Sequence, residues 1–296
     1  MGIHFLLSYA CNFTCDHCFL CCSPDSKGTM TINQIRTVLE ESEKLGTVQE
    51  VYFEGGEPFL YYPVMVEGIR LARDMGFSTG IVSNGYWSTS VDDAKLWLKP
   101  LSDLGISDLS VSDDSLHYGD DQESPARCAL AAAKAMGIPS NALSKEKPEV
   151  QDNADTGAGK GTPEISGGIK LRAVKKFAEG LPIRKCEEFK ECPYEELENP
   201  KRVHIDSYGN VQICQGISMG NCWKTPLSSL VQDYNVQKHP ITGPLVRGGP
   251  VQLAEEYQLN LKDEYVDECH FCYAARLALL DKFPDYLAPR QVYGID

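Results

Sequence analysis

The stretch "SYACNFTCDHCFLCCSP", residues Ser8–Pro24, holds five of the chain's twelve cysteines. A disulfide knot, a zinc site and an iron–sulfur site all use clustered cysteines, so their spacing must separate these possibilities. Cys11, Cys15 and Cys18 have the spacing C-x3-C-x2-C, which lets one loop present three thiolates to one metal centre. Structural zinc closes four positions, and an electron-carrying [4Fe–4S] cluster normally takes four cysteines. A cubane held by three thiolates would leave one iron open to a ligand from outside the protein.

Composition and charge narrow the functions that such a site could serve. The 296 residues can bury the core of one barrel-sized domain, or of one large and one small domain. The net charge of −14 argues against nucleic acid or an anionic membrane as the main partner. The apolar run at residues 3–10 is too short for a membrane span and lacks the basic flank of a signal peptide. We therefore expect a cytoplasmic protein, in which clustered cysteines bind metal more often than they form disulfides.

The first half of the chain alternates between short apolar runs and amphipathic segments, which predicts βα units and a mainly parallel sheet. We expect strands at residues 3–10, 50–56, 77–85, 106–112 and 138–144, and helices at 31–46, 62–76, 90–105 and 124–137. In the first helix, Thr31 and Gln34 have capping-box spacing, and Gly46 would end the helix. Active-site loops gather at the carboxyl ends of such strands.

This alternation stops at residues 145–168, which are polar and rich in Gly and Pro and are predicted to form a loop or linker. The segment contains "GAGKGT", but a Walker A loop would need glycine at Ala154 and Ser or Thr at Gly161, so nucleoside triphosphate binding is rejected. We divide the chain into a domain at 1–184 and a smaller domain at 185–296. In the smaller one, "RVHIDSYGNVQIC" (residues 202–214) predicts a β-hairpin.

The cysteine spacing resembles the signature of the radical S-adenosylmethionine (SAM) superfamily, C-x3-C-x-Φ-C with an aromatic residue at Φ. "YFEGGEPFL" (residues 52–60) adds the family's GGE motif at the end of the second expected strand. The third and fourth strands end in polar residues where similar proteins contact SAM. The resemblance covers roughly residues 3–142, and it implies a partial (β/α)6 barrel. The SAM contacts that it implies are His17 (at Φ), Gly55, Gly56, Glu57, Pro58, Ser83, Asn84, Ser112 and Asp113.

The same resemblance implies the chemistry. A [4Fe–4S] cluster on Cys11, Cys15 and Cys18 would bind SAM at its open iron and cleave it reductively to a 5′-deoxyadenosyl radical. That radical abstracts a hydrogen atom from the substrate, and a flavodoxin- or ferredoxin-type protein would supply the electron. Cys21 and Cys22 are expected to pack nearby as small buried thiols rather than to bind metal.

A second group of cysteines resembles the auxiliary-cluster extensions of radical SAM enzymes, called SPASM when long and twitch when short. Gly209 and Cys214 match the pattern Gly-x4-Cys, and Cys269 and Cys272 form a later C-x2-C. With Cys192, these cysteines would fully ligate a second [4Fe–4S] cluster. Two alternatives stay open: Cys186 or Cys222 could replace one of the four, or the four could form a zinc ribbon.

Together these motifs predict a radical SAM oxidoreductase. Its auxiliary cluster would accept an electron from the radical of a small molecule or a short protein segment. One alternative is maturation of a ribosomally made peptide, for which a peptide-recognition domain would be a separate protein; another is a zinc-binding, cysteine-rich interaction protein. The sequence identifies no catalytic residue. His117, Tyr118, Arg172 and His204 are candidates near the substrate, although residues of these types are more often structural.

Overall fold

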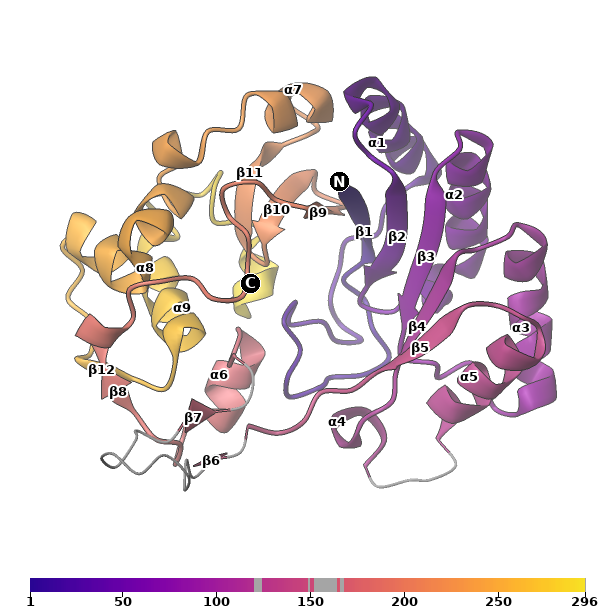
Figure 1. Ribbon diagram of the computed structural model, residues 1–296, viewed down its shortest axis with the longest axis horizontal. Coiled ribbons are helices and arrows are strands. Elements are labelled where there is room, and N and C mark those ends of the chain that lie inside the picture. The colour runs from indigo at the N-terminus through magenta and orange to yellow at the C-terminus, as the bar shows by residue number, and fades with distance from the viewer. Residues whose placement is uncertain (120–123, 149, 152–163, 166–167, 296) are drawn as a thin grey trace, which may run out of the picture.

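Five parallel strands connected by helices form the first half of the computed structural model, which describes residues 1–119, 124–148, 150–151, 164–165 and 168–295 (Figure 1). The strands are β1 (Gly2–Ser8), β2 (Glu50–Gly55), β3 (Ser78–Ser83), β4 (Asp108–Ser112) and β5 (Ser140–Leu143). The helices are α1 (Ile32–Leu45), the 3-10 helix η1 (Pro58–Tyr61), α2 (Tyr62–Asp74), α3 (Val91–Asp103), α4 (Ser115–Tyr118) and α5 (Pro125–Ala135). The predicted α/β alternation is confirmed.

Helix α1 illustrates how local sequence sets these elements. The Thr31 hydroxyl accepts a hydrogen bond from the Gln34 backbone N–H at 3.3 Å, and the Gln34 side chain accepts one from the Thr31 N–H at 2.8 Å. This capping box satisfies amide groups that would otherwise lack partners at the start of the helix. Gly46 ends the helix in the left-handed conformation, with φ of 65°. Both boundaries agree with the prediction from the sequence.

The rest of the chain contributes shorter elements. They are β6 (Val150–Gln151), β7 (Glu164–Ile165), α6 (Arg172–Phe177), β8 (Arg184–Lys185), η2 (Cys186–Glu188), β9 (Arg202–Asp206), β10 (Asn210–Cys214), β11 (Ile217–Asn221), α7 (Leu227–Gln232), η3 (Val236–Lys238), α8 (Thr242–Glu256), β12 (Glu264–Tyr265), α9 (Glu268–Leu279) and η4 (Arg290–Tyr293). The expected hairpin at 202–214 is present as β9 and β10. Most of the expected linker, including all of "GAGKGT", lies outside the described residues. The division into two domains stays a prediction.

Strand β9 joins the main sheet beside β1, so eight strands form one sheet in the order β11-β10-β9-β1-β2-β3-β4-β5. Strands β9 and β1 run parallel, with His204 opposite His4. The sixth parallel strand of the sheet therefore comes from the C-terminal part of the chain and not from the segment that follows β5. As a result, the hairpin that ends in Cys214 is part of the same sheet as the strand that leads into the cysteine loop.

The two faces of this sheet differ. Phe5 and Phe53 stack at 5.1 Å on the face covered by α1 and α2, and a Cβ on Gly68 of α2 would lie 2.7 Å from the Phe53 ring. Neighbouring residues of a strand point to opposite faces, so His4 and Glu54 point to the inner face, away from these helices. Helices α1, α2, α3 and α5 lie on one side of the strands, and α8 and α9 lie on the other (Figure 1). None of the helices in the described part of the chain has the length and hydropathy of a membrane span.

Candidate active site

The cysteine loop follows β1 directly and is fixed by the glycines at the end of β2. The Gly56 N–H donates to the Ser8 carbonyl at 2.6 Å, and the Glu57 N–H donates to the Ala10 carbonyl at 3.0 Å. A Cβ on Gly56 would lie 2.1 Å from the Ala10 carbonyl oxygen, so a residue with a side chain does not fit at this position. The structure therefore brings the two sequence motifs, the cysteines and Gly-Gly-Glu-Pro, into direct contact.

The thiols of Cys11, Cys15 and Cys18 lie within electrostatic reach of one another. Burial raises the pKa of Cys11 to about 11 and that of Cys15 to about 12, and the neighbouring Cys18 thiol adds to both shifts. A hydrogen bond from the Cys22 thiol lowers the pKa of Cys18 to about 6. Three soft sulfur donors in one loop suit an iron–sulfur cluster, since binding iron replaces the thiol protons. The donor set therefore fits a cluster that leaves one iron without a protein ligand.

The two remaining cysteines of the stretch are buried beside this loop. Cys22 donates its backbone N–H to the Cys18 sulfur at 3.3 Å, and Cys21 is 8% exposed. Arg172 of α6 holds the loop in place, because its guanidinium donates to the carbonyl oxygens of Cys15 and Cys22 at 3.0 and 2.8 Å. Arg172 thus contacts the cysteine loop rather than an open substrate space.

Glu57 is fully buried and does not present its charge to a ligand. Its carboxylate accepts hydrogen bonds from the Phe59 N–H at 3.0 Å, the Ser83 hydroxyl at 2.9 Å and the Asn84 N–H at 2.8 Å. Burial raises the pKa of Glu57 to about 7. Pro58 is the first residue of η1 and is also buried. The carboxylate therefore ties the turn after β2 to the end of β3 and fixes the position of Asn84.

The Asn84 side chain continues this connection to the cysteine loop. Its amide nitrogen lies 2.9 Å from the Asn12 side-chain oxygen and 3.8 Å from the Cys11 sulfur. Of the polar residues expected at the end of β3, Asn84 therefore reaches the cysteine loop, at Cys11 and Asn12. The Ser83 hydroxyl instead donates to Glu57 and accepts from the Trp87 indole N–H at 3.0 Å.

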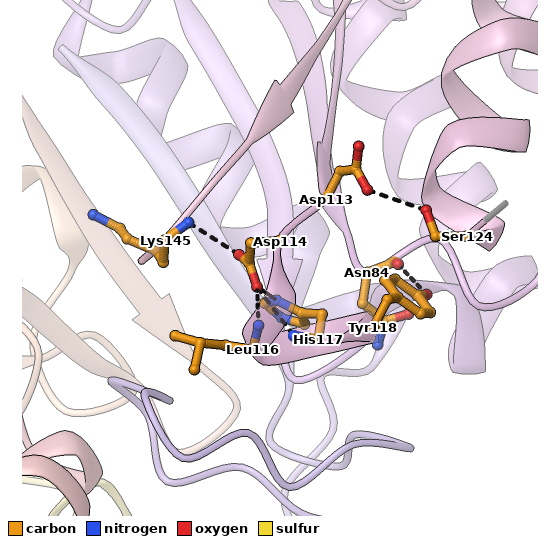
Figure 2. Close-up of polar contacts among 8 residues, drawn as sticks. All are labelled: Asn84, Asp113, Asp114, Leu116, His117, Tyr118, Ser124 and Lys145. Atoms are coloured by element: carbon orange, nitrogen blue, oxygen red, sulfur yellow. Dashed lines mark hydrogen bonds and ion pairs between the residues drawn. The ribbon is translucent and has the colours of Figure 1, made fainter. Parts of the chain in front are cut away.

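At the end of β4, two aspartates form the polar contacts shown in Figure 2. Asp113 accepts a hydrogen bond from Ser124 at 3.0 Å, and half-buried Ser112 precedes it in the strand. Asp114 caps α4 and contacts the His117 ring nitrogen Nδ1 at 2.8 Å, and its second oxygen accepts from the Lys145 N–H at 3.0 Å. Asp114 therefore joins the ends of β4 and β5 through one carboxylate.

Helix α4 contacts the cysteine loop through aromatic rings. The His17 ring meets the His117 ring edge-on at 4.8 Å, and Phe13 meets Tyr118 edge-on at 5.5 Å. The Tyr118 hydroxyl donates to the Asn84 carbonyl oxygen (Figure 2). Burial, with a further contribution from His117, lowers the pKa of His17 to about 4, so its ring is neutral near pH 7. The ends of β1, β3 and β4 thus meet around one loop, where five of the expected SAM contacts also lie. Those five are His17, Gly56, Glu57, Ser83 and Asn84.

The four cysteines of the second group line a single cavity, although they come from distant parts of the chain. Cys192 precedes β9, Cys214 ends β10, and Cys269 and Cys272 lie in the first turns of α9. Cys186 and Cys222, the two alternatives, do not line this cavity. Gly209 makes the hairpin turn before Cys214 with φ of 88°, and a Cβ there would lie 2.4 Å from the Trp223 ring. The donor set fits a closed four-thiolate centre.

Two cations also line this cavity, and the sequence analysis missed both. Lys170 pairs with Glu195 at 2.9 Å, and Arg276 is buried, with its guanidinium donating to the Gln215 carbonyl at 2.8 Å. Positive charge here offsets the negative charge that four thiolates bring to a buried centre. The sequence does hold a signal for Arg276. It lies four residues after Cys272 in α9, and residues four apart lie on the same face of a helix.

Comparison with known proteins gives a family match in the N-terminal half of the chain. The radical SAM superfamily model matches residues 5–139. The Bacillus subtilis protein YydG, provisionally described as a peptide biosynthesis protein, is 32% identical over 111 residues, 38% of this chain and 35% of YydG. A Pyrococcus furiosus protein described as modifying the cofactor of tungsten-containing aldehyde ferredoxin oxidoreductase is 33% identical over 107 residues, 36% of this chain and 28% of that protein. The chain thus matches about a third of the length of these relatives.

Among solved structures, BtrN in complex with AdoMet and 2-DOIA resembles this fold with a TM-score of 0.54. The alignment covers 83% of this chain and 87% of BtrN, at 17% sequence identity. At that identity the likeness concerns the fold alone. It extends beyond the N-terminal half into the C-terminal elements, where the second cavity lies.

Proposed function

We propose that this chain is a radical SAM oxidoreductase that removes two hydrogens from its substrate with the help of an auxiliary iron–sulfur cluster. The match of residues 5–139 to the radical SAM superfamily supports this proposal. The radical SAM family implies SAM and one [4Fe–4S] cluster. The auxiliary cluster, the type of reaction and the substrate go beyond the family and are our proposal.

The difference in thiol number between the two cysteine sites carries this proposal. Three thiols, Cys11, Cys15 and Cys18, lie in the loop after β1, and four other cysteines line the second cavity. A centre with three protein ligands can bind SAM, whereas a centre with four has no vacant iron and suits electron transfer. The two sites would therefore divide the reaction between them.

Several residues of the chain would hold the reacting groups in place. Gly55 and Gly56 keep the backbone of their turn close to the cysteine loop, where it can approach the amino group of SAM. Glu57 and Asn84 fix the end of β3 against that loop, and neutral His17 adds an apolar edge without repelling the sulfonium. When bound, SAM and the three-thiolate cluster supply a 5′-deoxyadenosyl radical that takes a hydrogen atom from the substrate.

The electrons balance with one external donor. A flavodoxin- or ferredoxin-type protein would give one electron for the cleavage of SAM to methionine and the radical. The substrate would give up one hydrogen atom, and then one proton and one electron. Cys192, Cys214, Cys269 and Cys272 would hold an auxiliary cluster that could take up this electron and pass it back to the first cluster or to the donor protein. Lys170 and Arg276 favour that electron's arrival, because positive charge stabilises the more negative, reduced form of a cluster.

The proposed substrate is a small molecule or a short protein segment. BtrN, whose fold is similar, is described in complex with the small molecule 2-DOIA. Peptide maturation is a second candidate, and the 32% identity to YydG over 111 residues favours it. The substrate class can be decided by incubating the holoenzyme with deuterated candidate substrates and measuring deuterium in 5′-deoxyadenosine.

A first experiment separates this function from that of a zinc-binding interaction protein. Anaerobically purified protein should be brown, contain about eight irons per chain for two [4Fe–4S] clusters, and release 5′-deoxyadenosine when SAM and a reductant are added. A colourless protein that binds zinc and leaves SAM intact would overturn the proposal.

A further inference from the structure

Three adjacent strands bring two histidines and one glutamate together on the inner face of the sheet. His4 lies in β1, Glu54 in β2 and His204 in β9, and His4 and His204 are directly opposite each other in the parallel pairing of β1 with β9. In the sequence, His204 follows His4 by 200 residues and Glu54 by 150. The group is distinct from both cysteine sites, although Glu54 immediately precedes the glycines that contact the cysteine loop.

The distances within this group match those between ligands of one metal ion. Glu54 Oε1 lies 3.3 Å from His4 Nδ1 and 3.1 Å from His204 Nε2, and all three atoms lie within 4.8 Å of one another. Ligand atoms about 2.1 Å from an ion are about 3.0 to 3.4 Å apart in octahedral or tetrahedral geometry. Two of the three atom pairs thus have the separation of two ligands of one ion, and the third pair lies within 4.8 Å.

An ordinary hydrogen-bonded pair of histidine and carboxylate looks different in this protein. His117 and Asp114 lie 2.8 Å apart and form a hydrogen bond. In the inner-face group, by contrast, His4 Nδ1 and Glu54 Oε1 are buried and meet at an ion-pair distance of 3.3 Å, without the geometry of a hydrogen bond. A buried polar atom that lacks a hydrogen bond costs about 1–3 kcal/mol, unless another species binds it. An ion held between these atoms would bind both of them.

The surroundings support an ion at this position. The Tyr52 ring stacks on the His4 ring at 4.9 Å with an interplanar angle of 12°, which restricts the orientation of the imidazole. The side chains of His4 and Glu54 remain 12% and 13% exposed, and that of His204 is 5% exposed. The group is thus shielded but open to the inner face, from which an ion can enter.

We propose that His4, Glu54 and His204 bind a divalent first-row transition-metal ion such as Zn²⁺, Fe²⁺ or Mn²⁺. Two imidazoles and one carboxylate are donors that these ions accept. Three protein ligands leave coordination positions open toward the inner face of the sheet. Those positions would take an oxygen or nitrogen group of a ligand, such as a carboxylate, hydroxyl or amine, in exchange for water. The site does not depend on the proposed oxidation.

The test uses the holoenzyme with its iron–sulfur clusters in place, so that the cysteine ligands are occupied. Free Mn²⁺ is measured by electron paramagnetic resonance during a titration, because Mn²⁺ prefers oxygen and nitrogen donors to spare thiols. Zinc retained after gel filtration is measured in parallel. The variants are Glu54→Gln and, as a matched control, Glu67→Gln, which removes a carboxylate that pairs with Arg70 on α2. His4→Gln repeats the test on another strand if Glu54→Gln does not fold.

Wild type and Glu67→Gln should each bind one ion per chain with the same affinity. Glu54→Gln and His4→Gln should weaken binding at least about tenfold, while their iron content and circular dichroism stay unchanged. The proposal is overturned if the affinities of Glu54→Gln and Glu67→Gln are the same for both ions. It is also overturned if Glu67→Gln weakens binding as much as Glu54→Gln, because the cause would then be the loss of negative charge in general.

Discussion

The two cysteine sites differ in how the chain assembles them. Cys11, Cys15 and Cys18 lie in one loop after one strand, whereas the second cavity gathers cysteines from a loop, the end of β10 and the start of α9. The first site takes its thiols from eight consecutive residues, 11–18, although Arg172 of α6 also contacts this loop. The second takes its thiols from segments up to 80 residues apart, from Cys192 to Cys272. The comparison teaches that an open centre can be built from local sequence, while a closed one requires long-range packing.

The largest effect is expected from removing a thiol of the first site. Cys15→Ala should abolish the formation of 5′-deoxyadenosine, because a cluster with two protein ligands is lost or binds SAM incorrectly. The assay is liquid chromatography of the products after addition of SAM and reductant. Cys128→Ala on α5 is the matched control and should retain full activity. Persistent SAM cleavage by Cys15→Ala would remove the first site from the mechanism.

Removing a thiol of the second site should separate cleavage of SAM from oxidation of the substrate. Cys214→Ala should lower the iron content from about eight to about four per chain and still release 5′-deoxyadenosine, but it should form no oxidised substrate. Cys222→Ala, outside the cavity, should keep about eight irons. If instead Cys222→Ala loses iron and Cys214→Ala does not, the ligand set is wrong.

A smaller effect is expected from the arginine beside each site. Burial raises the pKa values of Cys15, Cys214 and Cys272, and a nearby guanidinium offsets part of that rise: Arg172 at Cys15, and Arg276 at Cys214 and Cys272. Each arginine therefore acts on its own set of thiols. Arg276→Gln should lower the midpoint potential of the auxiliary cluster by an order of tens of millivolts, and Arg172→Gln should do the same for the first cluster. Redox titration followed by electron paramagnetic resonance measures both. If either variant shifted the midpoint potentials of both clusters equally, each arginine would not be acting on its own site.

The smallest effect concerns the stability of the turn that fixes the first site. The pKa of Glu57 is about 7 when folded and about 4.5 as the ordinary value, so the folded state favours the protonated carboxyl. Glu57 therefore stabilises the folded state fully below about pH 4.5, and this stabilisation is lost as pH rises to about 7. Each unit of difference between the folded and unfolded pKa corresponds to about 1.4 kcal/mol of unfolding free energy. Relative to Glu57→Gln, wild type should lose up to a few kcal/mol of unfolding free energy over this range.

Urea unfolding of both proteins after cluster removal, at several pH values, measures that difference. Glu50→Gln changes an exposed carboxylate at the start of β2 and is the matched control, for which the pH dependence should equal that of wild type. A difference between wild type and Glu57→Gln that stays constant from pH 4.5 to 7 would show that Glu57 does not titrate in this range.

The sequence predicts the parts of the molecule that depend on neighbours along the chain. The capping box of Thr31, the hairpin around Gly209 and the spacing of Cys11, Cys15 and Cys18 are all local patterns. The pairing of β9 with β1 is not, because parallel pairing across about two hundred residues leaves no local signature. For the same reason the meeting of His4, Glu54 and His204 could not be predicted. The burial of Glu57 could not be predicted either, since its partners lie on β3.

The central claim, that only the first site binds SAM, can be tested on single-cluster variants. Electron paramagnetic resonance spectra of reduced Cys214→Ala and Cys15→Ala are recorded with and without SAM. SAM should change the spectrum of Cys214→Ala, which keeps the three-thiolate cluster, and leave that of Cys15→Ala unchanged. A response to SAM from the cluster that remains in Cys15→Ala would contradict the account.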